Sequence, residues 1–229
     1  MTNEYNMKKG MQILKQIALP PRHTVYDILT PLVDATCSIY DSKAWGGMYS
    51  QVEPTVTNKV RESVLTLFNY LSISCPIVVE FTSIRQSIDN PNIPMLVTDL
   101  RIDDNARNNV IRAYNEYINY NSMAYYYPDY GNMRDSIILY DLRHVLPKSH
   151  DSMMEMLSAI SLYAADLAMP VFHECHHHIS TSRMLRNHMS AGDIIKLKEV
   201  QSFYNTFEST ARKYSVDMAE YLYRRKWVR

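Results

Sequence analysis

A short histidine-rich segment at residues 170–179, PVFHECHHHI, constrains this chain more than any other feature. It contains the pattern HExxH, in which Glu174 directly follows His173 and His177 lies four positions after His173. On an α-helix the two histidines lie about 40° apart on one face, with the carboxylate beside them. Two imidazoles can then bind one zinc ion while Glu174 reaches a water molecule on that ion. The alternative interpretation is a solvated, histidine-rich helix that binds metal nonspecifically.

The composition is typical of a globular protein, and its charge does not favour a polyanionic partner. Hydrophobic residues make up 46% of the 229 positions and charged residues 21%, and the formal net charge is zero. This length suits one domain, or one domain with an extension. A neutral chain is not drawn as a whole to nucleic acid or to an anionic membrane. We interpret the basic end at residues 224–229 as cations that complement a helix C-terminus, and we expect no nucleic-acid or membrane partner.

Cysteine usage and the N-terminus predict the compartment. The three cysteines, Cys37, Cys75 and Cys175, are odd in number and widely spaced, which argues against a disulfide framework and for a reducing environment. The first 15 residues lack the apolar segment of a signal peptide, and no run approaches 18 apolar residues. We therefore expect a soluble, cytoplasmic protein. If the Asn-, Ile-, Met- and Tyr-rich composition reflects a viral origin, the location would be the host cytoplasm or the virion.

Hydrophobic periodicity and turn residues predict a helix-rich chain with a few strands. We expect helices at residues 5–18, 24–40, 57–73, 105–120, 151–169 and 194–224, with the motif helix ending near residue 188, and strands at 77–81, 95–102 and 136–142. Residues 41–57 read as a loop, which divides the chain into a helical N-terminal extension (1–54) and a main domain (55–229). Pro170 either kinks a long helix or begins the motif helix. Seven tyrosines between residues 114 and 130 indicate either packing, which we favour, or a binding surface.

A zinc site built on HExxH requires a third protein ligand. From His177 to His188 a helix climbs about 17 Å, and from Ile194 to Glu208 a returning helix descends about 21 Å. An antiparallel pair of helices therefore brings Glu208 back to within about one turn of the motif. Glu199 falls short on the same arithmetic. The alternative is that Glu208 is a solvated carboxylate at the edge of the apolar stripe of its helix.

HExxH followed by Glu208 in the run FESTA resembles the gluzincin branch of the zincin metallopeptidases, in its small, minimal form. The resemblance covers residues 57–225 and implies an α+β, zincin-like fold, helix-rich, in which a small mixed sheet packs on the HExxH helix and a C-terminal helix carries the glutamate. The strand at 136–142 would then be the edge strand that pairs with an extended substrate. Three residues depart from the family pattern. Arg212 stands where an acidic partner of a ligand histidine is common. Cys175 and His176 occupy the middle of the motif, where small or apolar residues are commoner, and Cys175 is interpreted as a packing residue.

The resemblance implies a zinc metallopeptidase that acts on a peptide or protein substrate. Zn²⁺ would be held by His173, His177 and Glu208, and Glu174 would accept a proton from the zinc-bound water as it attacks the peptide carbonyl. The residue that stabilises the oxyanion stays open among His188, Tyr204, Tyr214 and the tyrosines near residue 125. The alternative is a non-enzymatic virion, scaffold or regulatory protein with a structural or vestigial zinc site.

Overall fold

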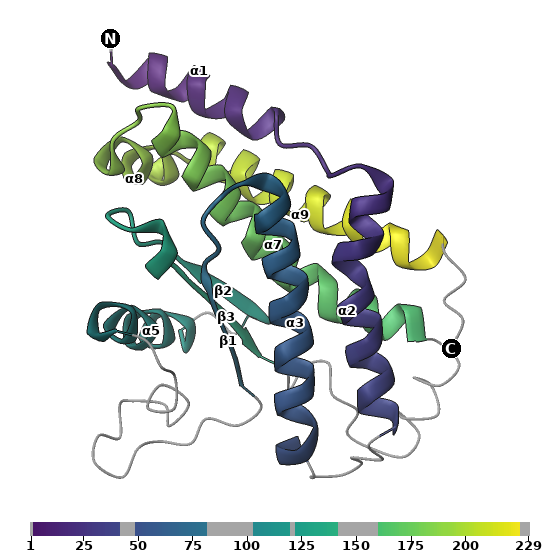
Figure 1. Ribbon diagram of the computed structural model, residues 1–229. Coiled ribbons are helices and arrows are strands. Elements are labelled where there is room, and N and C mark those ends of the chain that lie inside the picture. The colour runs from purple at the N-terminus through teal and green to yellow at the C-terminus, as the bar shows by residue number, and fades with distance from the viewer. Residues whose placement is uncertain (1, 42–48, 82–102, 120–121, 142–159, 225–229) are drawn as a thin grey trace.

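The computed structural model describes residues 2–41, 49–81, 103–119, 122–141 and 160–224, which form a helix-rich α+β fold (Figure 1). The helices are α1 (Thr2–Lys15), α2 (Arg22–Asp41), α3 (Tyr49–Leu71), α5 (Asp104–Tyr117), α7 (Ile160–Arg186), α8 (Ala191–Glu199) and α9 (Gln201–Arg224). The strands are β1 (Ile77–Phe81), β2 (Ala124–Tyr127) and β3 (Ile137–Asp141), and a 3₁₀ turn, η1 (Met133–Asp135), precedes β3. The predicted helix-rich α+β class is therefore confirmed.

The described strands form a mixed sheet in the order β1-β3-β2. β3 pairs in parallel with β1, with Ile77 opposite Ile137, and antiparallel with β2, with Ala124 opposite Tyr140. The expectation that residues 136–142 form an edge strand is therefore wrong, because β3 is the central strand. All five of its residues are buried, which is typical of a strand covered on both faces. The edge strand beside the motif helix is β2.

Side chains on the two faces of the sheet belong to two different cores. Ile137 and Leu139 pack with α5 residues, whereas Ile138 and Tyr140 pack with residues of α2, α3, α7 and α9. In Figure 1 helix α5 accordingly lies beyond the sheet, away from the helical layer. Because successive side chains of a strand point to opposite faces, one face of the sheet packs on α5 and the other on the remaining helices, which include the motif helix α7.

α7 is the central helix, and it continues through Pro170 without interruption. From residue 174 to residue 182 every side chain is buried, although most of them are polar. This burial excludes the solvated, histidine-rich helix considered above. α7 ends at Arg186, where His188 adopts a left-handed conformation (φ 60°) and the backbone N–H of Met189 donates to the Met184 carbonyl at 3.1 Å. This is the usual hydrogen-bonded termination of a helix by a left-handed residue.

The C-terminal segment forms two helices instead of the single one predicted at 194–224. α8 ends at Glu199, and the extended backbone of Val200 (ψ 114°) separates it from α9. Ser190 caps α8, because its hydroxyl oxygen accepts a hydrogen bond from the backbone N–H of Asp193. α9 then runs back along α7 in the opposite direction (Figure 1). The break moves the start of α9 but preserves the antiparallel arrangement on which the third ligand depends.

The N-terminal helices pack into the same cores as the rest of the described chain. Ile13 and Leu14 of α1 are buried against α7, α8 and α9, and α2 packs against both α3 and α7. α3 begins at Tyr49, so the loop predicted at 41–57 is too long. The predicted boundary between residues 54 and 55 falls within α3, and the division into an extension and a domain stays a prediction.

Other differences are local. Asp103 caps α5, because its carboxylate accepts a hydrogen bond from the backbone N–H of Ala106 at 2.9 Å. The tyrosine-rich segment supplies the last residues of α5 and the whole of β2, and Tyr117 and Tyr126 are buried, which supports the packing interpretation for these two. The strand predicted at 95–102, residues 151–159 of a predicted helix and most of the basic end lie outside the described residues.

Candidate metal centre

Two imidazoles of α7 face each other across one helical turn. His173 and His177 direct their Nε2 atoms to within 3.0 Å of one another, and their rings meet edge to face with centroids 4.6 Å apart. His177 is buried and His173 is partly exposed. The HExxH spacing therefore places both nitrogens on one side of α7, as the sequence predicts.

Glu208 of α9 completes a group of three donors. Its Oε2 lies 3.1 Å from His173 Nε2, and its Oε1 lies 3.4 Å from His177 Nε2. One ligand atom from each of the three residues falls within 4.8 Å of the others, and among the described residues this is the only such group of histidine, cysteine and carboxylate side chains. The predicted convergence of His173, His177 and Glu208 is confirmed. Glu199 is exposed at the end of α8 and does not belong to the group.

The distances within this group fit a small divalent ion. A tetrahedral ion with nitrogen and oxygen ligands at about 2.0–2.1 Å holds its donor atoms about 3.3–3.4 Å apart. The two imidazole nitrogens are 3.0 Å apart, and each lies 3.1 or 3.4 Å from a different oxygen of the Glu208 carboxylate, so each of these separations is close to that value. An ion could therefore bind without a large rearrangement of the three side chains. Three protein ligands beside an open cavity are typical of catalytic sites, whereas structural zinc sites usually have four.

The charges of the three residues suit metal binding. Burial raises the pKa of Glu208, but hydrogen bonds to His173 and His177 outweigh it, so the net pKa is lowered and the carboxylate is anionic. Burial lowers the pKa of His177 to about 4, which keeps this imidazole neutral at pH 7. Burial also lowers the pKa of His173, but the hydrogen bond to Glu208 and the charge of Glu174 raise it more. The group thus combines one anion with a neutral, buried nitrogen ligand.

Glu174 is a buried carboxylate beside the three donors, and it is not one of them. Burial raises its pKa to about 7, assisted by the charge of Glu208 and opposed by His173 and by a hydrogen bond from the Tyr126 backbone. A carboxyl group with this pKa can both accept and release a proton near neutral pH. Because Tyr126 lies in β2, this hydrogen bond also ties the edge strand to the motif helix.

One open cavity of about 460 Å³ contains all four motif and ligand residues. Its other walls come from β2 and the residues around it, from α8 and from the first turns of α9: Ser122, Ala124, Tyr125, Tyr126, Pro128, Tyr130, Lys198, Tyr204 and Phe207. Strand β2, the helix end carrying Lys198 and the donor group therefore surround one space, which is large enough for part of a peptide.

Only some of the residues predicted to stabilise the oxyanion line this cavity. His188 is exposed beyond the end of α7, and Tyr214 packs against His176 and lines a different pocket. Tyr125 lines the cavity but bonds through its hydroxyl to Glu116 of α5. Tyr204 lines the cavity and is partly exposed on α9, one turn before the ligand glutamate. Of the residues predicted from sequence, Tyr204 is therefore placed best.

An aromatic side chain packs on the ring of His177. Phe207 stacks on the His177 ring with centroids 4.2 Å apart and an angle of 11° between the planes. The Nδ1 atom of His177 is buried without a hydrogen-bond partner among the described residues. Arg212, at the position where an acidic residue was sought, is exposed. Ring stacking, rather than a hydrogen bond to Nδ1, holds this imidazole in place.

Lys198 was not predicted as a site residue. Its ammonium group lies 4.7 Å from the Phe207 ring centroid and 5.9 Å from that of Tyr130. Burial lowers its pKa to about 8, against the opposing charges of Glu208 and Glu174. The available sequence signal was weak: Lys198 follows Leu197, a residue of the apolar stripe, and so lies at the edge of that stripe.

No protein-family model, curated protein or solved structure matches this chain. Within the described part of the chain, no helix combines the length and apolarity needed to cross a bilayer. The cysteines are free, and Cys175 is buried in the main core, as expected for a packing residue. Functional inference therefore depends on the geometry of the candidate centre itself.

Proposed function

We propose that the protein is a zinc-dependent metallopeptidase with a zincin-like fold, in which His173, His177 and Glu208 bind Zn²⁺. The observation that carries this proposal is the position of Glu174, a buried carboxylate with its pKa raised to about 7, beside a three-donor group in an open cavity. The nitrogen and carboxylate donors and their close spacing favour zinc. Bound zinc would lower the pKa of a water molecule toward 7 and polarise the substrate carbonyl.

Residues of this chain would perform the proton transfers and hold the peptide. Glu174 accepts the proton of the attacking water and returns it to the amine nitrogen of the leaving fragment. Tyr204 is the candidate donor to the oxyanion. The substrate is expected to extend beside β2, since this strand is at the edge of the described sheet and lines the cavity. Pairing through main-chain atoms would make recognition tolerant of sequence.

A Glu174→Gln variant tests the mechanism. Glutamine has nearly the same shape but cannot accept the proton, so hydrolysis of an unfolded protein or of a quenched fluorescent peptide should fall by about 10²–10⁴-fold. Metal analysis should still find about one zinc per chain, since three ligands remain. Glu199→Gln, an exposed change on α8, is the matched control and should preserve both activity and zinc. Full activity in Glu174→Gln would contradict the mechanism.

A non-enzymatic protein with a structural or vestigial metal site is the second candidate. Among the described residues, the Nδ1 atom of His177 has no hydrogen-bond partner. This observation favours a vestigial site, because metal-binding imidazoles usually donate a hydrogen bond from their other nitrogen and lose metal affinity or activity without it. Zinc binding by the wild type without cleavage of any unfolded substrate would support this candidate. The same preparations and assays therefore distinguish the two proposals.

A further inference from the structure

Lys198 places a cation in the wall of the candidate metal-site cavity. An ammonium group has three hydrogen-bond donors. Within the described residues, Lys198 forms no hydrogen bond or ion pair, and its contacts are the faces of Phe207 and Tyr130. Aromatic faces attract a cation, but they offer it no acceptor oxygen. Within the part of the chain that the structure describes, this partly buried cation therefore has no anionic partner in direct contact, although buried lysines usually have one.

The location of this cation relates it to the metal site. The ammonium nitrogen lies 4.7 Å from the Phe207 ring centroid, and that centroid lies 4.2 Å from the centroid of the His177 ring. The nitrogen is therefore within about 9 Å of the centre of the His177 ring. An extended peptide advances about 3.3–3.6 Å per residue. A group bound to Lys198 would therefore belong to a residue one or two positions from the bond under attack.

The charge balance of the cavity indicates the sign of that group. With a divalent ion bound, with Glu174 and Glu208 ionised and with Lys198 protonated, the cavity carries one net positive charge. A substrate group with one negative charge would neutralise it and would provide acceptors for the ammonium donors. Lys198 also attracts the two glutamates at longer range, but neither forms an ion pair with it within the described chain.

We propose that Lys198 is a specificity-determining residue that binds a substrate carboxylate one or two residues from the scissile bond. This assignment rests on the proposed peptidase function and adds a substrate class to it. Two sources share the chemistry: the terminal carboxylate of a short peptide fragment, and the side chain of an internal aspartate or glutamate. The first would make the protein a trimming enzyme for peptide ends, and the second an endopeptidase that prefers acidic sequences.

Binding can be measured separately from catalysis in the zinc-loaded Glu174→Gln protein. The probes are fluorescent peptides of one sequence with either a free C-terminus or a C-terminal amide, and two amidated peptides with glutamate or glutamine at an internal position. We expect the free acid or the internal glutamate to bind about tenfold or more tightly than its neutral counterpart, because a hydrogen-bonded charge pair is involved. The pair that shows the preference identifies the source of the carboxylate.

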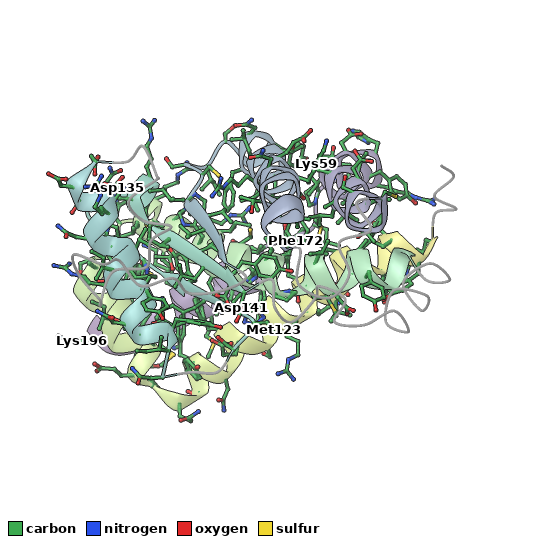
Figure 2. All side chains as sticks on the ribbon, turned by 90° about the horizontal axis from the view of Figure 1, so that it is seen from below. Lys59, Met123, Asp135, Asp141, Phe172 and Lys196 are labelled. Atoms are coloured by element: carbon green, nitrogen blue, oxygen red, sulfur yellow. The ribbon has the colours of Figure 1, made fainter. Side chains whose placement is uncertain are left out.

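Substitutions then assign the preference to one side chain. In the same background, Lys198→Met should abolish it by removing the charge while keeping an unbranched side chain, and Lys198→Arg should retain it. Lys196→Met is the matched control on the same helix, where Lys196 is exposed at the periphery of the molecule (Figure 2), and it should retain the preference. Equal binding of charged and neutral peptides by the Lys198-containing protein, or an unchanged preference in Lys198→Met, would overturn the assignment.

The same experiments test the peptidase function and the role of Lys198 separately. Peptide hydrolysis by the wild type without any preference for carboxylates would overturn the role of Lys198 alone. Carboxylate-selective binding that depends on Lys198, without hydrolysis by the wild type, would support a binding site and overturn the peptidase. If no peptide binds and none is cleaved, both proposals are wrong.

Discussion

Replacing Glu208 by glutamine should remove most of the stabilisation that zinc gives to the fold. The carboxylate lies between the two imidazoles, with oxygens 3.1 and 3.4 Å from their Nε2 atoms, and supplies the anionic donor of the group. Glutamine has almost the same size and can still accept a hydrogen bond from an imidazole. The variant therefore loses the charge and the metal-ligand bond, while the packing between α7 and α9 is preserved.

The expected shift follows from linkage and from the length of the chain. At free zinc a thousandfold above the dissociation constant, binding to the native state adds about 4.1 kcal/mol to the free energy of unfolding. A chain of 229 residues has an unfolding entropy of about 0.5 kcal/mol per degree, so Tm should rise by about 8 °C. If Glu208→Gln weakens binding a hundredfold, the same zinc concentration adds about 1.4 kcal/mol, or about 3 °C.

Differential scanning calorimetry of the metal-free and zinc-loaded forms measures this shift. Glu199→Gln is the control, since Glu199 is the glutamate that the helix arithmetic rejected and it is exposed on α8. It should show the full wild-type shift. A zinc-induced shift in Glu208→Gln equal to that of the wild type would refute the assignment of Glu208 as a ligand. An absence of any shift in the wild type would refute the metal site itself.

Two further predictions concern the side chains around the centre. Burial lowers the pKa of His178, whose Nε2 lies 2.7 Å from the Ser74 carbonyl oxygen, to about 4. The native state therefore binds fewer protons than the unfolded state between pH 6.5 and 4, and acidification of the metal-free protein from pH 7 to pH 5 should lose about 2 kcal/mol of stability through this group. His178→Gln keeps a donor for Ser74, and urea denaturation at the two pH values should show the loss reduced by that amount; an unchanged loss would contradict the reasoning. Phe207→Leu removes the ring stacked on His177, and its zinc dissociation constant, measured against a competing chelator, should rise about tenfold, whereas Phe203→Leu, an equally buried change on the same helix, should leave it near the wild-type value.

The ligand group could be predicted from sequence because it depends on regular helical geometry. The separation of His173 and His177 is fixed within one turn, and the return to Glu208 depends only on the rise per residue and on an antiparallel direction. The unpredicted break at Val200 shows how tolerant this reasoning is. Val200 has neither glycine nor proline beside it, so local signals could not reveal the break. The ligand nevertheless lies where the arithmetic places it, because α9 still packs along α7.

The apolar sequence of β3 indicates a central strand. An edge strand with one solvated face usually alternates apolar and polar residues, whereas residues 137–140 read Ile-Ile-Leu-Tyr without a polar member. A continuous apolar run indicates a strand covered on both faces, and β3 is covered in this way. Strand β2 was harder to predict because its Ala-Tyr-Tyr-Tyr sequence suits a helix, a strand or a surface equally. Its role beside Glu174 depends on a tertiary hydrogen bond that no local pattern encodes.

Glu174 is the residue that separates an enzyme from a protein with only a structural ion. A structural site needs its ligands, and His173, His177 and Glu208 would serve that purpose without any neighbouring carboxylate. Burying an additional ionisable group costs stability, and an apolar residue of similar volume would usually be neutral or stabilising at such a position. The raised pKa of Glu174 agrees with such a cost, since burial is its main cause. A group kept in this state, in contact with an open cavity, is readily explained by proton transfer and is difficult to explain by folding alone.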